Sequence, residues 1–376
     1  MLPSDASPLT TPQPSLTADA SPLPAPHSSL TAHRSPLTAP LSSLTAYRSP
    51  LTAPLSSLTA HRSPLTASLI TGVNGFVGKH LSAHLLSKNR AVVGIDIQEE
   101  CAAAGIRYFK ANICDSDAMT EIFNSTRPRE IFHCAAISSP HEFHLTPYDS
   151  FQINLMGTIS LFEAMRTSGS DAVMLVIGSA KQYKAATPSQ KISETDILGP
   201  ASYYGVSKYA GEMIGRYYIE QHGLDIRFTR SFNHTGPGQS MKFVCSDWAR
   251  QIALIDLKKS PSRIFVGNTD VGIDFSDVRD VAEAYRLIVE KGKKGEAYNV
   301  CSNKGASLKY ILKYLIAKSP LKISVRVQQE KVKAHAAGAE LIGDNRKLRE
   351  ATGWSPRLPI EKTLDDLYDW WKQELK

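Results

Sequence analysis

The first 67 residues lack most of what a folded core needs. They contain no glycine and no Val, Ile, Phe or Trp, and their only aromatic side chain is Tyr47. They hold 12 of the 22 prolines and repeat every 14 residues, with copies that begin at Ser7, Ser21, Ser35, Ser49 and Ser63. Because isolated leucines cannot offset the entropy of ordering such a chain, we expect residues 1–67 to be disordered. A targeting peptide is the alternative, since the stretch is rich in Ser, Thr and Ala and carries three arginines.

Other absences narrow the class of protein. No run approaches 18 apolar residues, so no membrane-spanning helix and no membrane partner are expected. The five cysteines form no CxxC pair, which argues against a disulfide scaffold, zinc module or other metal site and favours reduced thiols in the cytoplasm. The net charge of +7 is dispersed among many acids and comes with no recognisable nucleic-acid module. We therefore expect a small anionic substrate and no nucleic acid.

From Ser68 onward the pattern changes to alternating strands and helices. The apolar run before Thr71 leads into Gly72, Gly75 and Gly78 and then into a helical repeat. A strand, a glycine turn and a helix start in this order are typical of a dinucleotide-binding site. Gly72 permits the tight turn, Gly75 lets the backbone approach a pyrophosphate, and Gly78 allows close packing of helix on strand.

A carboxylate stands where such a site contacts the adenosine ribose. Asp96 ends the buried-strand pattern of residues 91–96, and it follows Gly72 by 24 residues. A carboxylate there accepts both ribose hydroxyls and repels a 2′-phosphate. Asp96 therefore favours NAD(H), with NADP(H) as the alternative.

A tyrosine and a lysine follow with helical spacing. The apolar strand pattern of residues 172–177 leads to Ser179, and Tyr204 and Lys208 come later at positions i and i+4. On a helix these two side chains share a face. We expect the ammonium to lower the phenol pKa toward working pH, so that Tyr204 can exchange a proton with a carbinol oxygen.

The alternation of short apolar strands and helices predicts the fold class. It indicates an α/β protein with a Rossmann-type, doubly wound parallel sheet and a smaller C-terminal substrate-binding domain behind a disordered N-terminal tail. We expect the NAD(P)-binding domain to span 68–236 and the substrate-binding domain to take most of 237–376. The helical pattern of residues 281–290 and a strand over 296–300 are expected to return to the first domain.

Together these motifs resemble the extended short-chain dehydrogenases/reductases that act on nucleotide sugars, in the NAD-dependent epimerase/dehydratase family. The likeness covers about Leu69 to Leu375 and is strongest to the GDP-mannose dehydratase and GDP-4-dehydro-6-deoxy-mannose reductase branch. Beyond the glycine turn and YYGVSK, it includes HCAA from His133, SFNHTGPGQ from Ser231, YNVCS from Tyr298 and LIGDNRKLREATGWSP from Leu341.

The resemblance implies roles for individual residues. Ser179, Tyr204 and Lys208 would be catalytic, with Tyr204 as the acid/base and Lys208 on the nicotinamide ribose. The cofactor would be held by Gly72, Asn74, Gly75, Phe76, Val77, Gly78, Asp96, Asn112, Ile113, Ala135, Ala136, Asn154, Tyr204 and Lys208. The substrate would be contacted by Ser179, Lys181, Asn233 and Arg250. His133 is expected to be a satisfied core residue.

Several positions depart from the family. The two residues after the catalytic serine carry an acid in 4,6-dehydratases, and the second is a cysteine in fucose-forming epimerase/reductases. Here they are Ala180 and Lys181. The arginine of the family's Arg-Asp-Phe/Tyr motif is replaced by Ile273, and an Arg-Pro pair is replaced around Ala334. Bidentate arginine–phosphate pairs are strong, so the absence of these two arginines removes two expected contacts to the nucleotide diphosphate. Lys331, Lys333, Arg250 or Arg279 are candidate replacements.

The expected function is NAD(P)H-dependent reduction of a nucleotide-linked 4-keto-6-deoxy sugar of the GDP-4-dehydro-6-deoxy-mannose type. A nucleotide-sugar 4-epimerase with retained NAD is the alternative. A 4,6-dehydratase and a non-catalytic NAD-binding protein rank lower. The family implies a homodimer formed through a helix bundle that includes the helix of Tyr204.

Overall fold

The computed structural model describes residues 67–138, 146–184, 191–328 and 341–376. The disorder expected of residues 1–67 is wrong for Ala67, which begins strand β1 (Ala67–Thr71), and residues 1–66 lie outside the described residues. Lys331, Lys333 and Ala334 also lie outside them. No helix within the described ranges is long and apolar enough to cross a membrane.

Seven parallel strands form the main sheet, in the spatial order β3-β2-β1-β4-β5-β7-β11. Their bounds are β1 Ala67–Thr71, β2 Ala91–Asp96, β3 Ile106–Lys110, β4 Glu130–His133, β5 Val173–Ser179, β7 Asp225–Ser231 and β11 Ala297–Val300. Most of their residues are buried, as expected for a parallel sheet covered on both faces. The order reverses between β1 and β4, where open α/β sheets bind ligands. The predicted Rossmann fold is confirmed.

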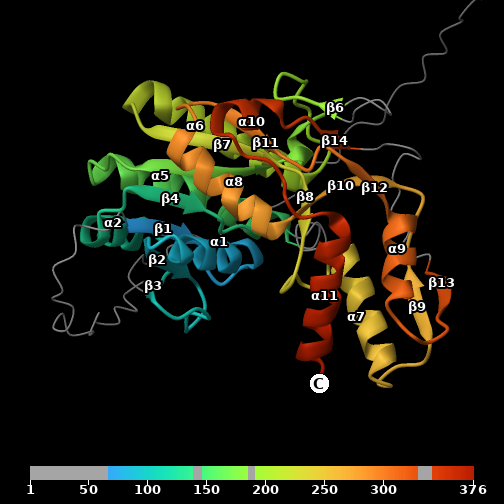
Figure 1. Ribbon diagram of the computed structural model, residues 1–376. Coiled ribbons are helices and arrows are strands. Elements are labelled where there is room, and N and C mark those ends of the chain that lie inside the picture. The colour runs from blue at the N-terminus through green and yellow to red at the C-terminus, as the bar shows by residue number, and fades with distance from the viewer. Residues whose placement is uncertain (1–66, 139–145, 185–190, 329–340) are drawn as a thin grey trace, which may run out of the picture. The chain divides into compact units, whose positions relative to one another are not determined.

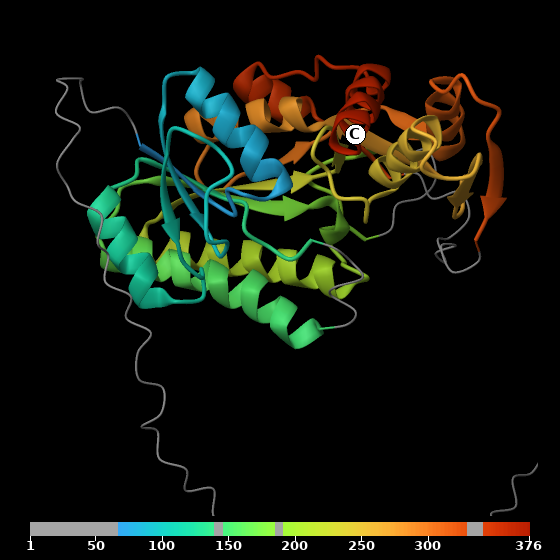
Figure 2. The same cartoon turned by 90° about the horizontal axis from the view of Figure 1, so that it is seen from below.

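Helices cover both faces of this sheet (Figures 1 and 2). One face carries α1 Phe76–Ser87, α8 Val278–Lys291 and α10 Arg346–Thr352, and the other carries α2 Ser116–Thr126, α5 Gly157–Thr167 and α6 Tyr203–His222. In α1 the buried positions are 78, 81, 82 and 85, which is the spacing of a single helix face. Each helix layer thus has its own apolar core against the sheet.

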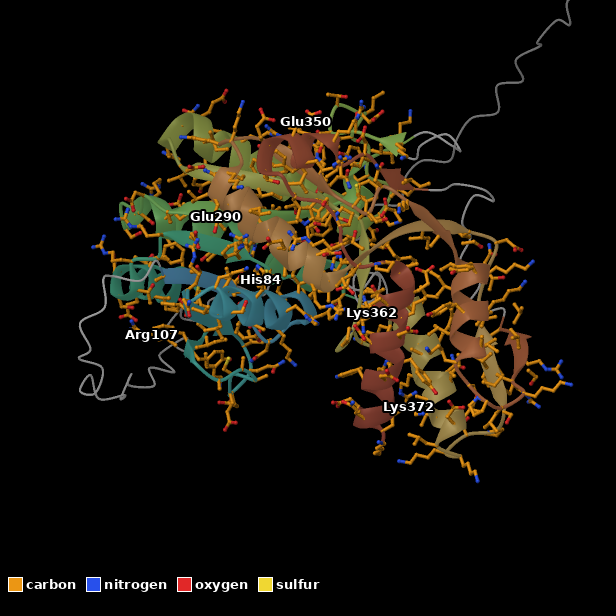
Figure 3. The ribbon with its side chains drawn as sticks, in the orientation of Figure 1. His84, Arg107, Glu290, Glu350, Lys362 and Lys372 are labelled. Carbon is orange, nitrogen blue, oxygen red and sulfur yellow. The ribbon has the colours of Figure 1, made fainter. Side chains whose placement is uncertain are left out.

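Charged side chains frame the face formed by α1 and α8. Figure 3 marks His84 on α1 and Glu290 on α8. Arg90, which precedes β2, contacts Glu290 at 2.6 Å and Glu130 at 2.9 Å. These two ion pairs join the end of α8 to the amino-terminal ends of β2 and β4. They lie at the sheet edge that faces away from the expected cofactor site.

A second set of elements lies beyond the sheet and builds a separate apolar cluster. It contains α7 Val244–Asp256, β9 Arg263–Val266, α9 Leu308–Ala317, β13 Ser324–Val327 and α11 Ile360–Glu374. Strands β8 Asn233–Thr235, β10 Gly272–Asp277 and β12 Gly305–Ser307 form a small sheet, and β6 Lys191–Ile192 pairs with β14 Ile342–Gly343. Short segments α4 Pro147–Phe151, the π-helix η1 Gln152–Met156 and the 3-10 helix η2 Ala180–Gln182 complete the described elements.

Three elements after residue 236, namely α8, α10 and β11, belong to the main sheet and its helix layers, and a helix and a strand were expected there from the sequence. Helix α8 packs on α1, and β11 pairs in parallel with β7. The chain therefore passes between the main sheet and the outer cluster more than once.

Candidate active site

The glycine turn between β1 and α1 has room only for backbone. Gly72 adopts a φ of +70°, and a Cβ there would lie 2.8 Å from the backbone of Ala135. A Cβ on Gly78 would lie 2.2 Å from the Gly72 carbonyl oxygen. Helix α1 starts after Gly75 without a side-chain cap. An uncapped helix start behind such a turn attracts anions, so these residues, with Phe76 and Val77 in the first turn, fit a dinucleotide diphosphate.

Asp96 lies next to this turn, and backbone amides fix its carboxylate. The N–H of Asn74 donates to it at 3.0 Å and the N–H of Ile97 at 2.8 Å. The Asn74 side chain donates to the Glu100 carbonyl and accepts from the Ala102 N–H, both at 2.8 Å. The Asn74 side chain thus holds the loop after β2 against the glycine turn. The resemblance to the family implied only a cofactor contact for this residue.

The remaining cofactor candidates follow β3 and β4 at the same sheet edge. Asn112 accepts from the Cys114 N–H at 3.0 Å, while Ile113 is buried against Gly157. The N–H of Ala135 donates to the Thr71 hydroxyl at 3.2 Å, and Ala136 comes next. The side chain of Ile113 therefore contributes packing, and any cofactor contact at that position falls to its backbone.

Asn154 lies in the π-helix η1 and is buried. Its amide accepts from the Ile137 N–H at 2.8 Å and donates to the Ile137 carbonyl at 3.0 Å and the Ser207 hydroxyl at 3.2 Å. These contacts tie the segment after β4 to α6. Single π-helical turns often occur at functional sites, and this one places the side-chain amide of Asn154 in the protein interior.

Ser179 and Tyr204 come together as the sequence predicts. Ser179 ends β5, and its side chain lies beside the Tyr204 phenol in the first turn of α6, near enough to affect the pKa of that phenol. The Lys208 ammonium lies 6.0 Å from the centre of the Tyr204 ring. The three side chains expected to be catalytic thus form one cluster at the carboxyl end of β5.

The expected lowering of the Tyr204 pKa is wrong for this chain. Burial raises the pKa of Tyr204 to about 12, and the nearby Ser179 side chain only opposes this rise. Burial also lowers the pKa of Lys208 to about 8. Desolvation of the phenolate is the larger effect, so the Tyr204 phenol is protonated at neutral pH.

His133 is confirmed as a satisfied core residue. Its ring nitrogens lie 2.8 Å from the Thr71 and Thr158 hydroxyls, which join β1, β4 and α5. Burial lowers the pKa of His133 to about 3, and the nearby Lys208 adds to this effect. The neutral imidazole of His133 therefore holds the ends of β1 and β4 to α5 by hydrogen bonds.

The predicted substrate residues are more scattered. Lys181 is exposed in η2, two residues after Ser179, and Asn233 is exposed where β8 begins beside β10. The guanidinium of Arg250 lies 5.8 Å from the centre of the Trp371 ring, within the packed pair of α7 and α11. None of the contacts described here joins Arg250 to Ser179 or Tyr204.

Of the two positions that lack the family's arginine, only Ile273 belongs to the described residues, and it packs in an apolar environment. Ile273 bridges to Leu341 and packs against the outer apolar cluster. Arg279, one candidate replacement, contacts Asp277 at 2.7 Å and Asp366 at 2.8 Å. Because both carboxylates hold its guanidinium, Arg279 is a structural residue.

Sequence reasoning missed the polar residues behind the catalytic cluster. Gln182 and Glu212 are buried, and together they connect Ser179 with α6. The sequence shows Gln182 three positions after Ser179 and Glu212 four positions after Lys208, and this spacing is the signal that could have revealed them. Ile97 was also missed, and it lies 69% exposed beside Asp96.

Comparisons with known proteins identify the family. Residues 69–367 match the family model described as GDP-mannose 4,6 dehydratase. GDP-6-deoxy-D-mannose reductase of Pseudomonas aeruginosa is 30% identical over 308 residues, which cover 82% of this chain and 97% of that protein.

Two solved structures have the same fold. The structure of RMD from Pseudomonas aeruginosa complexed with NADPH superposes with a TM-score of 0.71 at 28% identity, covering 81% of this chain and 99% of that one. The Thermus thermophilus UDP-glucose 4-epimerase complex with NAD gives 0.72 at 23% identity, over 81% and 99% of the two chains. The chain therefore belongs to the GDP-mannose 4,6-dehydratase family of extended short-chain dehydrogenases/reductases, the NAD(P)-dependent enzymes that reduce, dehydrate or epimerise nucleotide sugars.

Proposed function

We propose that this enzyme reduces a nucleotide-linked 4-keto-6-deoxy sugar, with GDP as the nucleotide. The observation that carries the proposal is the placement of Ser179 and Lys208 beside the Tyr204 phenol, together with Ala180 and Lys181 where dehydratases hold an acid. A keto group can be reduced without that acid, whereas elimination of a hydroxyl depends on it. The 30% identity to a GDP-6-deoxy-D-mannose reductase supports the same choice.

In the proposed mechanism the side chains of the cluster handle the proton. Tyr204 donates its phenolic proton to the C4 oxygen of the sugar, and Ser179 hydrogen-bonds that oxygen. Lys208 stabilises the negative charge that builds on Tyr204, which then regains a proton from solvent. Bound NAD(P)H supplies the hydride that C4 receives.

We propose NADH as the preferred reductant. The glycine turn and the start of α1 would hold the diphosphate, and Asp96 would accept the ribose hydroxyls. Glu100 lies in the loop that Asn74 fastens after Asp96, and the Glu99 carboxylate pairs with Lys110, so Asp96 carries the preference against a 2′-phosphate. The exposed Ile97 offers an apolar surface to the adenine.

We also propose that the outer cluster around α7, α9 and α11 is the substrate-binding domain. Lys181 and Asn233 flank the catalytic cluster and would contact the sugar or its phosphates. Arg250 would reach the nucleotide only if its guanidinium left Trp371.

A 4-epimerase with retained NAD is the second candidate. Asp96 favours it, because such an enzyme keeps NAD rather than exchanging NADPH. The same Tyr204 would first remove the proton of a C4 hydroxyl and later return it to the same oxygen. The bound nicotinamide would take the hydride from C4 and return it to the opposite face of the sugar ring.

A homodimer and a cytoplasmic location remain part of the proposal. Large apolar side chains are exposed on α4, η1 and α6, namely Tyr148, Met156, Tyr203, Val206 and Tyr217. Such a surface favours association with a second copy. All five cysteines are unpaired, which fits a reducing compartment.

The test is incubation with a GDP-linked 4-keto-6-deoxy sugar and C4-deuterated NADH or NADPH. A reductase oxidises the nicotinamide in proportion to substrate, and the product carries deuterium at C4. An epimerase instead inverts C4 of a nucleotide sugar without net oxidation, and its NAD co-purifies. Absence of oxidation by folded, NADH-binding protein would exclude the reductase proposal for that sugar.

A further inference from the structure

The catalytic serine is held from behind by one glutamine side chain. The N–H of Ser179 donates to Gln182 Oε1 at 2.8 Å, and the N–H of Lys181 donates to Ser179 Oγ at 3.2 Å. Together these bonds close a capping box at the start of η2. The fit is tight, because a Cβ on Gly178 would lie 2.3 Å from Gln182 Oε1.

The other end of the Gln182 amide is fixed by α6. Gln182 Nε2 donates to Glu212 Oε2 at 2.8 Å. Glu212 lies eight residues after Tyr204 and four after Lys208 on the same helix. One amide therefore connects the end of β5, which carries Ser179, with the helix that carries Tyr204 and Lys208.

Glu212 is buried and remains ionised because two arginines surround it. Arg230 of β7 donates to its two oxygens at 2.8 and 3.1 Å, and Arg216 donates at 2.8 Å. Burial alone would raise the pKa of Glu212, but these guanidinium groups hold it below its usual value. The exposed fractions of Gln182, Glu212 and Arg230 are 0, 2 and 4%.

The charge of Glu212 decides which way the amide faces. A carboxylate only accepts hydrogen bonds, so Gln182 must turn its NH₂ group toward Glu212. Its carbonyl oxygen then faces the opposite way, where the Ser179 N–H meets it. The arginines thus act on the serine through two intermediate side chains.

We propose that Gln182 and Glu212 are positioning residues that hold the Ser179 hydroxyl against Tyr204. This inference rests on the proposed function, because the alignment of the two hydroxyls matters for turnover only if they serve the reaction. Loss of the amide leaves Ser179 at the end of a strand with its N–H unpaired, and the serine then drifts from the phenol. Misplacement by about 1 Å is enough to lower turnover by roughly a hundredfold.

The first variant is Gln182→Leu, which keeps the side-chain size and removes both hydrogen bonds. We expect kcat to fall about tenfold to a hundredfold, with the dissociation constant of NADH unchanged within about twofold. Thr352→Val is the matched control, since it removes a buried hydroxyl that donates to the Leu348 carbonyl and accepts from the Trp354 N–H, without touching Gln182 or its partners. Its kcat should stay at the wild-type value. An unchanged kcat in Gln182→Leu would overturn the inference.

A charge exchange gives the sharper test. Gln182→Glu places two carboxylates against each other and should lower kcat as much as Gln182→Leu. Adding Glu212→Gln restores a donor on one side and an acceptor on the other, so kcat should recover to within about threefold of wild type. A merely structural role predicts no such recovery of kcat, and its absence in a folded double variant would refute the proposal.

A measurement without turnover separates this inference from the proposed function. Hydrogen exchange of the Ser179 amide, followed in peptides that cover 173–183, should quicken in Gln182→Leu and return to the wild-type rate in the double variant. If wild type turns nothing over but exchange behaves in this way, the proposed function fails and the positioning contact stands. Unchanged exchange in Gln182→Leu contradicts the contact itself.

Discussion

At the scale of single residues, burial sets the protonation of the site. Burial raises the pKa of Tyr204 to about 12 and lowers the pKa values of Lys208 and His133 to about 8 and 3. Each shift favours the neutral form of its group. With Tyr204 protonated and His133 neutral, the phenol can donate a proton to a keto oxygen. The proposed reduction requires proton transfer in this direction.

The neutral His133 makes a prediction about stability and pH. Its folded pKa lies below the ordinary value, so below about pH 6.5 the unfolded chain binds a proton that the folded chain does not. Stability should therefore fall as the pH drops from 7 to 4.5, with His133 contributing about 2–3 kcal/mol of that loss. Urea unfolding at the two pH values should show a loss smaller by this amount in His133→Gln.

The matched control for that prediction is His222→Gln, at the exposed end of α6. It should leave the pH dependence unchanged. Burial also lowers the pKa values of His80, His84 and His234, so part of the dependence persists in every variant. Equal pH dependence in wild type and His133→Gln would show that this imidazole is not held neutral.

Sequence patterns predicted that Ser179, Tyr204 and Lys208 lie together, but they did not predict the pKa values of these groups. The spacing of Tyr204 and Lys208 brought them to one helix face, and the strand before Ser179 brought the serine to the same place. The pKa of Tyr204 depends on how deeply the folded protein buries its hydroxyl, and the spacing of residues in the sequence does not show this burial. The Gln182–Glu212 contact likewise joins two segments 30 residues apart through side chains whose orientation only packing decides.

At the scale of elements, the contact between β1 and α1 depends on glycines. A Cβ on Gly78 would lie 2.2 Å from the Gly72 oxygen and 2.8 Å from Val73 backbone atoms. We therefore expect Gly78→Ala to force α1 away from the turn and to destabilise the protein by about 1–3 kcal/mol. NADH binding should weaken at least tenfold, as isothermal titration would measure.

Gly211→Ala is the control for that substitution. Gly211 lies inside α6, and a Cβ there would meet nothing within 4 Å. Alanine should stabilise this helix by about 0.5–1 kcal/mol and leave NADH binding unchanged. If Gly78→Ala behaved like Gly211→Ala, the close approach at the turn would not constrain the cofactor site.

Most elements of the main sheet were predictable because each carries its own pattern. A helix over 281–290 and a strand over 296–300 were expected to return to the first domain, and α8 Val278–Lys291 packs on α1 while β11 Ala297–Val300 pairs with β7. The short strands β6, β8, β12 and β14 carry two or three residues each, too few for periodicity to reveal. The π-helix around Asn154 also has no sequence signal, because one extra residue in a turn leaves the helical pattern nearly intact.

At the scale of the whole molecule, the exposed apolar surface on α4, η1 and α6 makes a prediction about assembly. A charge at Val206, which is 39% exposed on α6, should convert a dimer into a monomer. Val206→Glu would be compared with Leu321→Glu, whose side chain is equally exposed at 39% and lies outside this surface. Sedimentation should show a dimer for wild type and Leu321→Glu and a monomer for Val206→Glu. A monomeric wild type, or a dimer in every variant, would refute this interface.

The central claim is that Tyr204 donates the proton that accompanies hydride transfer to a sugar keto group. The most direct test is single-turnover NADH oxidation by wild type, Tyr204→Phe and Tyr203→Phe with a GDP-linked 4-keto-6-deoxy sugar. Tyr203 is the matched control, since it precedes Tyr204 on α6 and is 55% exposed. We expect Tyr204→Phe to lose about 10²–10⁴-fold in rate and Tyr203→Phe to match wild type. A rate in Tyr204→Phe equal to that of wild type would contradict the account.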